Sequence, residues 1–100
     1  MFVMQIVGLV DGNSSAFDGK FLMEYDPERE GVSPDGLPML AHIAVTLDPD
    51  DALTWERGSE ALEEWKRVSV RWPRRLDGQP NRPLSAFTVE VMSLEKARGS

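Results

Sequence analysis

Basic and aromatic side chains gather in one short segment of the second half of the chain. Between Lys66 and Arg82 there are six Lys or Arg residues and a single Asp. Arginines can bind phosphate groups while an indole that lies between them in the sequence stacks on a nucleobase. The side chains that we predict to bind a protein or a nucleic acid are Arg71, Trp72, Arg74, Arg75, Asn81 and Arg82.

The same segment also has a structural explanation. Trp72 would anchor the loop to the core, and the arginines would pair with the acidic stretch 48–64 of the same chain or of a neighbour. This explanation is favoured because the chain has a net charge of −6, so that the remaining surface would repel nucleic acid. The prolines that flank Asn81 and Arg82 hold them extended, either as a rigid recognition edge or as a stiff return to the last strand.

The only histidine, His42, could act as a general base. It cannot form a zinc site without Cys, which the chain lacks, and no recognisable catalytic motif places a Ser or an acid beside it. We therefore interpret His42 as a partly exposed strand residue.

Two acidic clusters raise the possibilities of metal binding and carboxylate catalysis. Around Asp48, Asp50 and Asp51 the spacing is not that of a calcium-binding loop, and helix capping explains the acids. The glutamates of residues 60–64 lie on the solvent side of an amphipathic helix, and no phosphate-binding glycine motif accompanies them. The sequence predicts no catalytic residue, no metal site and no cofactor.

Charge is distributed unevenly along the chain. Residues 1–65 hold three Lys or Arg against fourteen Asp or Glu, and residues 66–100 hold eight against three, giving −11 and +5. A surface with both signs of charge suits docking to a second copy or to a charged partner.

The absence of Cys fits a cytoplasmic protein, and the apolar run 2–10 is too short for a signal peptide or a membrane span.

A nearly continuous apolar run predicts a strand in residues 2–7 that is buried on both faces or close to it. Alternation of apolar and polar residues predicts further strands in residues 20–25, 40–47 and 86–92. Asp48 is expected to cap a short helix that ends near Trp55, and Ser59 to cap the main helix over residues 60–68. These elements predict the α+β class: a two-layer, mainly antiparallel four-stranded sheet with one main helix and one short helix on one face.

Alternation along the strands assigns their side chains to two faces. Toward the helix we expect Phe21, Met23, Tyr25, Ala41, Ile43, Val45, Leu47, Phe87, Val89 and Val91, packed against a helical stripe of Ala61, Leu62, Trp65 and Val68. The opposite face would carry Gln5, Lys20, Leu22, Glu24, His42, Thr46, Thr88 and Glu90, a mixed surface available for self-association.

We expect residues 1–95 to form a single α+β domain, with a frayed tail over residues 96–100. The proline-rich stretch 26–38 is expected to be an exposed excursion from this domain and not a linker.

Three sequence patterns in the second half of the chain resemble small uncharacterised proteins of bacteria, phages and mobile elements. The patterns are Thr46-x-Asp48-x-x-x-Ala52-x-x-Trp55, Glu60-Ala61-x-x-x-Trp65 and Asp77-Gly78-Gln79-Pro80-Asn81-Arg82-Pro83-Leu84. The resemblance implies a cytoplasmic accessory role and brings no catalytic residues with it.

The leading functional hypothesis is a non-catalytic interaction domain that docks a protein partner or a second copy of itself as a homodimer. The alternative is a nucleic-acid-binding accessory protein that uses the basic segment 71–82. Neither hypothesis involves a membrane, a metal or a cofactor.

Overall fold

A computed structural model describes residues 1–33, 35–39, 41–75 and 77–99. Its main sheet has four antiparallel strands in the order β5-β2-β1-β6. Their bounds are β1 (Phe2–Leu9), β2 (Phe21–Asp26), β5 (His42–Thr46) and β6 (Phe87–Ser93). The predicted α+β class is confirmed. Of the expected strand 40–47, Leu40 lies outside the described residues.

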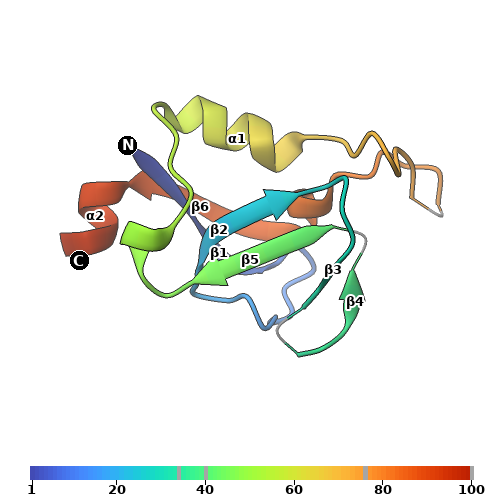
Figure 1. Cartoon of the computed structure of the whole chain (residues 1–100), viewed down its shortest axis with the longest axis horizontal. Coiled ribbons are helices and arrows are strands. Elements are labelled where there is room, and N and C mark those ends of the chain that lie inside the picture. The colour runs from blue at the N-terminus through green and yellow to red at the C-terminus, as the bar shows by residue number, and fades with distance from the viewer. Residues whose placement is uncertain (34, 40, 76, 100) are drawn as a thin grey trace.

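The main helix α1 (Gly58–Lys66) lies across one face of the sheet, as Figure 1 shows. Ala61 is fully buried there and belongs to a core cluster with Met4, Ile6, Phe17, Leu22, Ala41, Ile43, Leu84 and Phe87. Trp55 and Trp65 are half-buried against this cluster. The apolar residues of alternate strand positions therefore meet the inner face of α1, as a two-layer fold requires.

The expected helical stripe is wrong at two positions, because Leu62 is 43% exposed and because α1 ends at Lys66, so that Val68 lies beyond the helix. The cap of α1 also differs from the prediction. The helix begins at Gly58 and not after Ser59, and the side chain of Glu60 accepts the Arg57 backbone N–H at 3.0 Å. A glutamate at the third helical position that reaches back in this way replaces the serine cap.

The expected alternation fails in β2, because the pairing of β2 with β5 shifts register between Leu22 and Glu24. Met23 is the extra residue of this bulge, and an extra residue reverses the faces on either side of it. Leu22, expected on the outer face, is fully buried in the core cluster, while Phe21, which is also buried at 8% exposure, pairs with Gln5 on the outer face and is not part of that cluster. The assignments of both residues are therefore corrected.

A second bulge lies in β1, where the pairing with β6 shifts between Ile6 and Gly8. Val7 is the extra residue and is 52% exposed, so β1 is not buried on both faces at this point. At the end of β5, Leu47 is 75% exposed and lies outside the core in which it was expected.

Two short 3-10 helices complete the connections: η1 (Pro49–Asp51) and η2 (Pro83–Ala86). As predicted, Asp48 caps η1, because its carboxylate accepts the Asp50 N–H at 2.9 Å. This helix is shorter than expected and ends before Trp55, whose backbone N–H and C=O instead pair with those of Phe2.

Residues 94–99 form the helix α2 (Leu94–Gly99), so the described part of the tail that was expected to be frayed is helical, and Ser100 lies outside the described residues. Arg98 of this helix is ion-paired with Asp50 of η1. The hairpin of β3 (Gly31–Val32) and β4 (Pro38–Met39) begins within the excursion 26–38 and ends one residue beyond it. Pro27 of the excursion is buried, and Pro34 lies outside the described residues. None of the helices in the described ranges is both long enough and apolar enough to cross a membrane.

Candidate docking site at the basic loop

The chain leaves α1 at Arg67, whose extended backbone ends the helix, and runs to η2 through residues 67–82, here named the basic loop. Ser69, near its start, has no exposed surface. Its Oγ accepts the Trp72 N–H at 3.1 Å and lies 3.0 Å from the Pro27 carbonyl oxygen and 2.9 Å from Oε1 of Glu28. A hydroxyl with a single proton donates to one of these two oxygens at a time.

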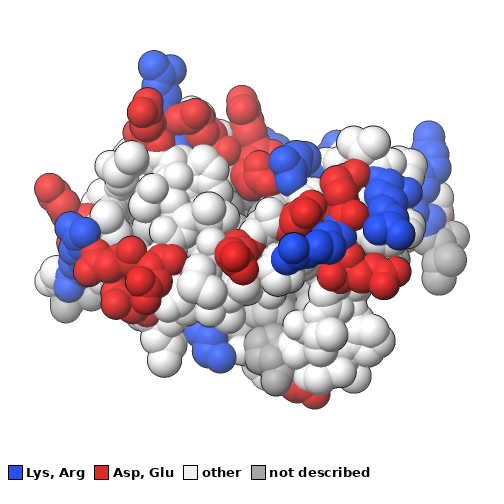
Figure 2. Space-filling view, in the orientation of Figure 1, with Lys and Arg blue, Asp and Glu red and all other residues white. Residues whose placement is uncertain are grey.

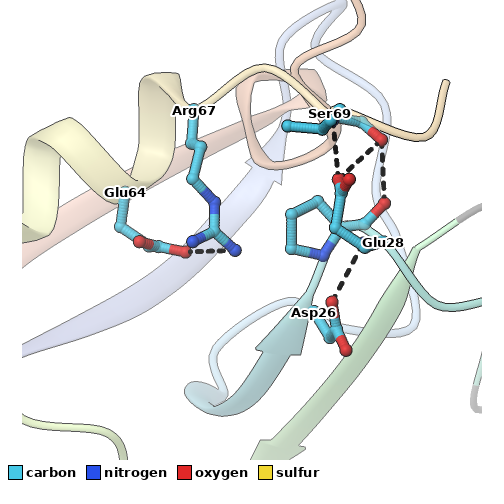
Figure 3. A network of polar contacts seen from close by, with 7 residues as sticks. Asp26, Glu28, Glu64, Arg67 and Ser69 are labelled. Carbon is cyan, nitrogen blue, oxygen red and sulfur yellow. Dashed lines mark hydrogen bonds and ion pairs between the residues drawn. The ribbon is translucent and has the colours of Figure 1, made fainter. Parts of the chain in front are cut away.

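Glu28 makes the second half of this attachment, shown in Figure 3. Its carboxylate accepts the backbone N–H of Val70 at 2.8 Å and of Arg71 at 2.7 Å. Its own backbone N–H donates to the side chain of Asp26 at 2.9 Å, which fixes the turn that follows β2. The start of the basic loop is thereby tied to a segment about forty positions earlier in the chain.

The carboxylate of Glu28 is held in its ionised form. Desolvation raises its pKa, but the hydrogen bonds from Ser69 and from the Val70 and Arg71 amides lower it, as does the charge of Arg67. The net result is a pKa below the ordinary value.

Asn81 closes the loop on itself. Its Nδ2 donates to the Trp72 carbonyl at 2.7 Å, its backbone N–H donates to the Pro73 carbonyl at 3.0 Å, and its own carbonyl accepts the Ser69 N–H at 2.9 Å. Asn81 is thus a structural residue of the loop as well as a member of the predicted site.

The far end of the loop turns at Asp77-Gly78, as the sequence predicts. Gly78 has φ of 83°, a conformation that glycine adopts without strain. The Gln79 N–H donates to the Asp77 side chain at 3.0 Å, and the Arg75 N–H donates to the Gln79 carbonyl at 2.8 Å. The loop is therefore a narrow hairpin whose two sides are hydrogen-bonded to each other.

The four predicted arginines have different surroundings. The Arg71 guanidinium lies 4.4 Å from the centre of the Trp72 ring, Arg74 donates to the Gly78 carbonyl, and Arg75 is 3.3 Å from the Asp77 carboxylate. In the described part of the chain, the Arg82 side chain has neither a hydrogen bond nor an ion pair.

Within the described part of the chain, none of these four arginines pairs with the acidic stretch 48–64 of the same chain, and pairing with a neighbouring molecule stays a prediction. Arg67, just before them, does reach Glu64 at 3.1 Å, and it lies 5.6 Å from the centre of the Tyr25 ring. Trp72 is half-buried beneath Arg71 and is not a member of the core cluster, so the loop is anchored by Ser69 and not by the indole.

A groove of 790 Å³ separates the second side of the loop from the end of β1. Its lining residues are Leu9, Val10, Asp11, Arg75, Gln79, Pro80, Asn81, Arg82, Pro83, Ser85 and Ala86. The structure thus brings three predicted site residues together in one groove and leaves the Arg71–Trp72 pair and Arg74 outside it.

Sequence reasoning missed the opposite wall of this groove. Val10, which is 62% exposed, continues the apolar run of β1, and its N–H donates to the Ala86 carbonyl at 3.0 Å. The signal in the sequence is that Val10, an apolar residue, directly precedes the polar turn that begins at Asp11, where an apolar side chain is exposed and available for contact.

Figure 2 shows how charge is spread over one side of the molecule. Acidic side chains gather along the upper edge, over α1, and at the left, over η1. Basic side chains gather at the right, over the basic loop, with acidic ones between them. The uneven charge of the sequence becomes a surface with an acidic end and a mixed, locally basic end.

The other residues considered for chemistry lie apart from this groove. His42 Nε2 is 3.2 Å from Oε2 of Glu24 on the outer face of the sheet, and neither residue lines the groove. Within the described ranges, no group of three or more His, Asp or Glu side chains is placed to bind a metal ion.

Comparison of the chain with protein-family models, with curated proteins and with solved structures finds no match.

Proposed function

We propose that this domain is a non-catalytic docking module that binds an acidic, extended segment of a partner protein in the groove beside the basic loop. The observation that carries the proposal is that Arg75 and Arg82 line one groove together with the apolar Val10 and Pro83. Guanidinium groups bind carboxylates in well-defined geometry, and apolar walls bind the side chains between them.

Preorganisation supports the same function. The hydrogen bonds of Glu28, Ser69 and Asn81 hold the basic loop before any partner arrives, and the prolines at 80 and 83 restrict the backbone that presents Arg82. A site that is already ordered loses little conformational entropy when it binds.

A protein partner is favoured over a nucleic acid for two reasons. The face of Trp72 is occupied by the Arg71 guanidinium, so that ring face is not open for a base to stack. Among the described residues, the groove is lined by only two arginines, Arg75 and Arg82, and Asp11 lies among them, so it offers few contacts to a nucleic-acid backbone that carries a phosphate at every nucleotide.

Fluorescence anisotropy at about 50 mM salt, where charge contacts are strong, tests the proposal. The probes are a fluorescein-labelled peptide of alternating Glu and Leu, the matching peptide of alternating Lys and Leu, and single- and double-stranded oligonucleotides. We expect binding of the acidic peptide alone. Tighter binding of an oligonucleotide would replace this proposal with nucleic-acid recognition, and the absence of peptide binding would refute it.

The variant that tests the groove is Arg82→Gln, which we expect to weaken peptide binding about tenfold because it removes a charge-assisted contact. Lys66→Gln is the matched control, since Lys66 is an exposed cation of α1 that does not line the groove. Equal losses in the two variants would show that net charge, and not the groove, determines binding.

A further inference from the structure

The two edges of the main sheet are protected differently. The backbone of β3 lies against the start of β5, and a Cβ added at Gly31 would come within 2.8 Å of the Ala41 carbonyl oxygen. The opposite edge, β6, is seven residues long, has no proline and carries Glu90 as its one charged residue. Natural edge strands are usually blunted by prolines, bulges, charges or covering segments, and β6 has few of these protections.

Hydrogen bonds at both ends of β6 show which backbone groups face its open side. The Ala86 carbonyl accepts the Val10 N–H, and the Leu94 N–H donates to the Met1 carbonyl, so the positions just before and just after β6 face β1. Backbone direction alternates along an antiparallel strand. Residues 88, 90 and 92 therefore also face β1, and residues 87, 89, 91 and 93 face outward.

The N-terminal end of this edge is already occupied. Nε1 of Trp65 donates to the Phe87 carbonyl at 3.0 Å, and the Phe87 N–H donates to the Leu84 carbonyl. Beyond it, the outward N–H and C=O groups of Val89 and Val91 have no hydrogen-bond partner in the described ranges. These four groups form a short, unpaired template for another strand.

The C-terminal end of the edge is left clear. After Ser93 the chain enters α2, which packs back across β1 and β6 toward η1, where Arg98 pairs with Asp50. In Figure 1 this helix lies at the end of the sheet where the N-terminus also lies. The open stretch of the β6 edge therefore spans residues 89–93, and its last residue, Ser93, also begins the first turn of α2, where its Oγ accepts the Lys96 N–H at 3.1 Å.

We infer that β6 pairs antiparallel with β6 of a second copy of this chain, with Val91 opposite Val91 of the partner on the two-fold axis. Glu90 then lies opposite Met92 of the partner, and the overlap is confined to the free stretch 89–93 of both copies. A register centred on Glu90 would place the Glu90 carboxylates of the two copies opposite each other. A register centred on Val89 would need the N–H and C=O of Phe87 to pair with the partner, and both already form hydrogen bonds within their own copy.

Such a dimer joins two sheets into one of eight strands and leaves the two β5 edges at its ends. It satisfies the outward groups of Val89 and Val91 in both copies by a symmetric contact, which requires no component other than this chain. Glu90 keeps its ion pair with Lys96 of its own copy, whose Nζ lies 3.6 Å from the Glu90 carboxylate. This surface is separate from the groove, none of whose lining residues belongs to β6.

Sedimentation equilibrium over a range of protein concentrations, at about 50 mM and about 500 mM salt, measures the monomer–dimer equilibrium. Each copy has a net charge of −6, so the two copies repel each other. Salt screens that repulsion, and we expect the dimer to be more populated at high salt. A monomer at all concentrations and at both salts would overturn the inference, whether or not the groove binds peptide.

The register is tested by a matched pair of substitutions at one position. Met92→Glu places a like charge opposite Glu90 of the partner twice in each dimer, and we expect the dimer to weaken about tenfold. Met92→Lys removes the same side chain but creates two opposite-charge pairs, and we expect it to keep or tighten the dimer. Equal effects of the two variants would overturn the proposed register.

Val91→Pro tests the edge itself. It removes an outward N–H without removing a β1–β6 hydrogen bond, and we expect the dimer to weaken tenfold or more. Circular dichroism shows whether this variant folds, and the Met92 pair tests the same contact if it does not. A folded Val91→Pro variant that dimerises like the wild type would exclude the β6 edge as the interface.

Discussion

Replacing Ser69 with alanine tests whether the attachment to the turn after β2 holds the basic loop in place. Ser69 has no exposed surface, and its hydroxyl contacts the Trp72 N–H, the Glu28 carboxylate and the Pro27 carbonyl at 2.9–3.1 Å. Ser69→Ala removes all three contacts and leaves the backbone of the loop otherwise unchanged. The substitution therefore isolates the contribution of one hydroxyl.

The size of the effect follows from those contacts. The single hydroxyl proton makes one donated hydrogen bond at a time, and the oxygen accepts a second, so two hydrogen bonds are lost. At about 1 kcal/mol for each, the free energy of unfolding should fall by about 2 kcal/mol. For a domain of this length, such a loss lowers Tm by roughly 10 °C.

Urea denaturation followed by Trp fluorescence measures the loss of stability, and amide hydrogen exchange locates it. We expect faster exchange at Val70, Arg71 and Trp72, whose N–H groups donate to Ser69 or Glu28, and little change in β1. Ser14→Ala is the control, because Ser14 is exposed and its hydroxyl has no hydrogen bond within the described residues. The reasoning is refuted if Ser69→Ala matches the wild type in both stability and exchange.

Three further predictions concern other named groups. The lowered pKa of Glu28 in the folded state means that its contribution to stability is complete above the ordinary value of 4.5 and is lost as pH falls through the folded pKa. Glu28→Gln should therefore flatten the acid side of a curve of urea midpoint against pH. Burial raises the pKa of Tyr25 to about 12 from the ordinary 10.0, so its contribution is complete below pH 10.0 and is lost as pH rises toward 12. Because Tyr25 is the single tyrosine, phenolate absorbance reads this titration directly, and a midpoint at the ordinary value would contradict the prediction. Gly31→Ala should destabilise the domain by about 1–3 kcal/mol, since its Cβ meets backbone atoms of residues 41 and 42. Gly99→Ala, which meets no atom within 4 Å, should have little effect in the same thermal denaturation.

Local signals were sufficient to predict most of the elements. A nearly continuous apolar run predicted the first strand of the main sheet and alternating apolar residues predicted the other three, and the Asp48 side chain caps η1 as its position before Pro49 indicates. Asp77-Gly78 forms the expected turn. Each of these signals depends on residues within a few positions of one another, where the chemistry of the side chain and the backbone conformation are directly linked.

Which face of the sheet each strand residue occupies was predicted less accurately, because a bulge shifts the alternation and no residue type in the strand identifies the bulge. The extra residues Val7 and Met23 are ordinary strand formers, yet each reverses the face of the residues around it. This is why Leu22 is in the core and Phe21 is on the outer face. A register shift depends on how two strands align, and hydrophobic periodicity in one strand does not record it.

The site was predicted only in part for a different reason. The basic loop was identified from its own residues, but Glu28, which fixes its conformation, is 42 residues from Val70 and lies in a stretch expected to be exposed. A carboxylate that accepts backbone N–H groups needs no particular side chain from the loop, so nothing in the sequence of the loop indicates the partner. Val10 was missed as the opposite wall of the groove because the two walls meet only in the folded chain.

Added salt should change binding at the two proposed surfaces in opposite directions, because charge attracts the ligand at the groove and repels the second copy at the β6 edge. The groove attracts an acidic segment through Arg75 and Arg82, so added salt should weaken peptide binding. The β6 edge joins two copies of net charge −6 through backbone groups, so added salt should favour the dimer. If both equilibria weakened with salt in parallel, the two copies would be held together by the acidic residues of one copy and the basic loop of the other, and not by β6. Arg82→Gln would then disrupt the dimer more than Lys66→Gln does. Pairing through β6 predicts instead that the two variants dimerise equally well, because each makes the net charge of every copy more negative by one and neither residue belongs to β6.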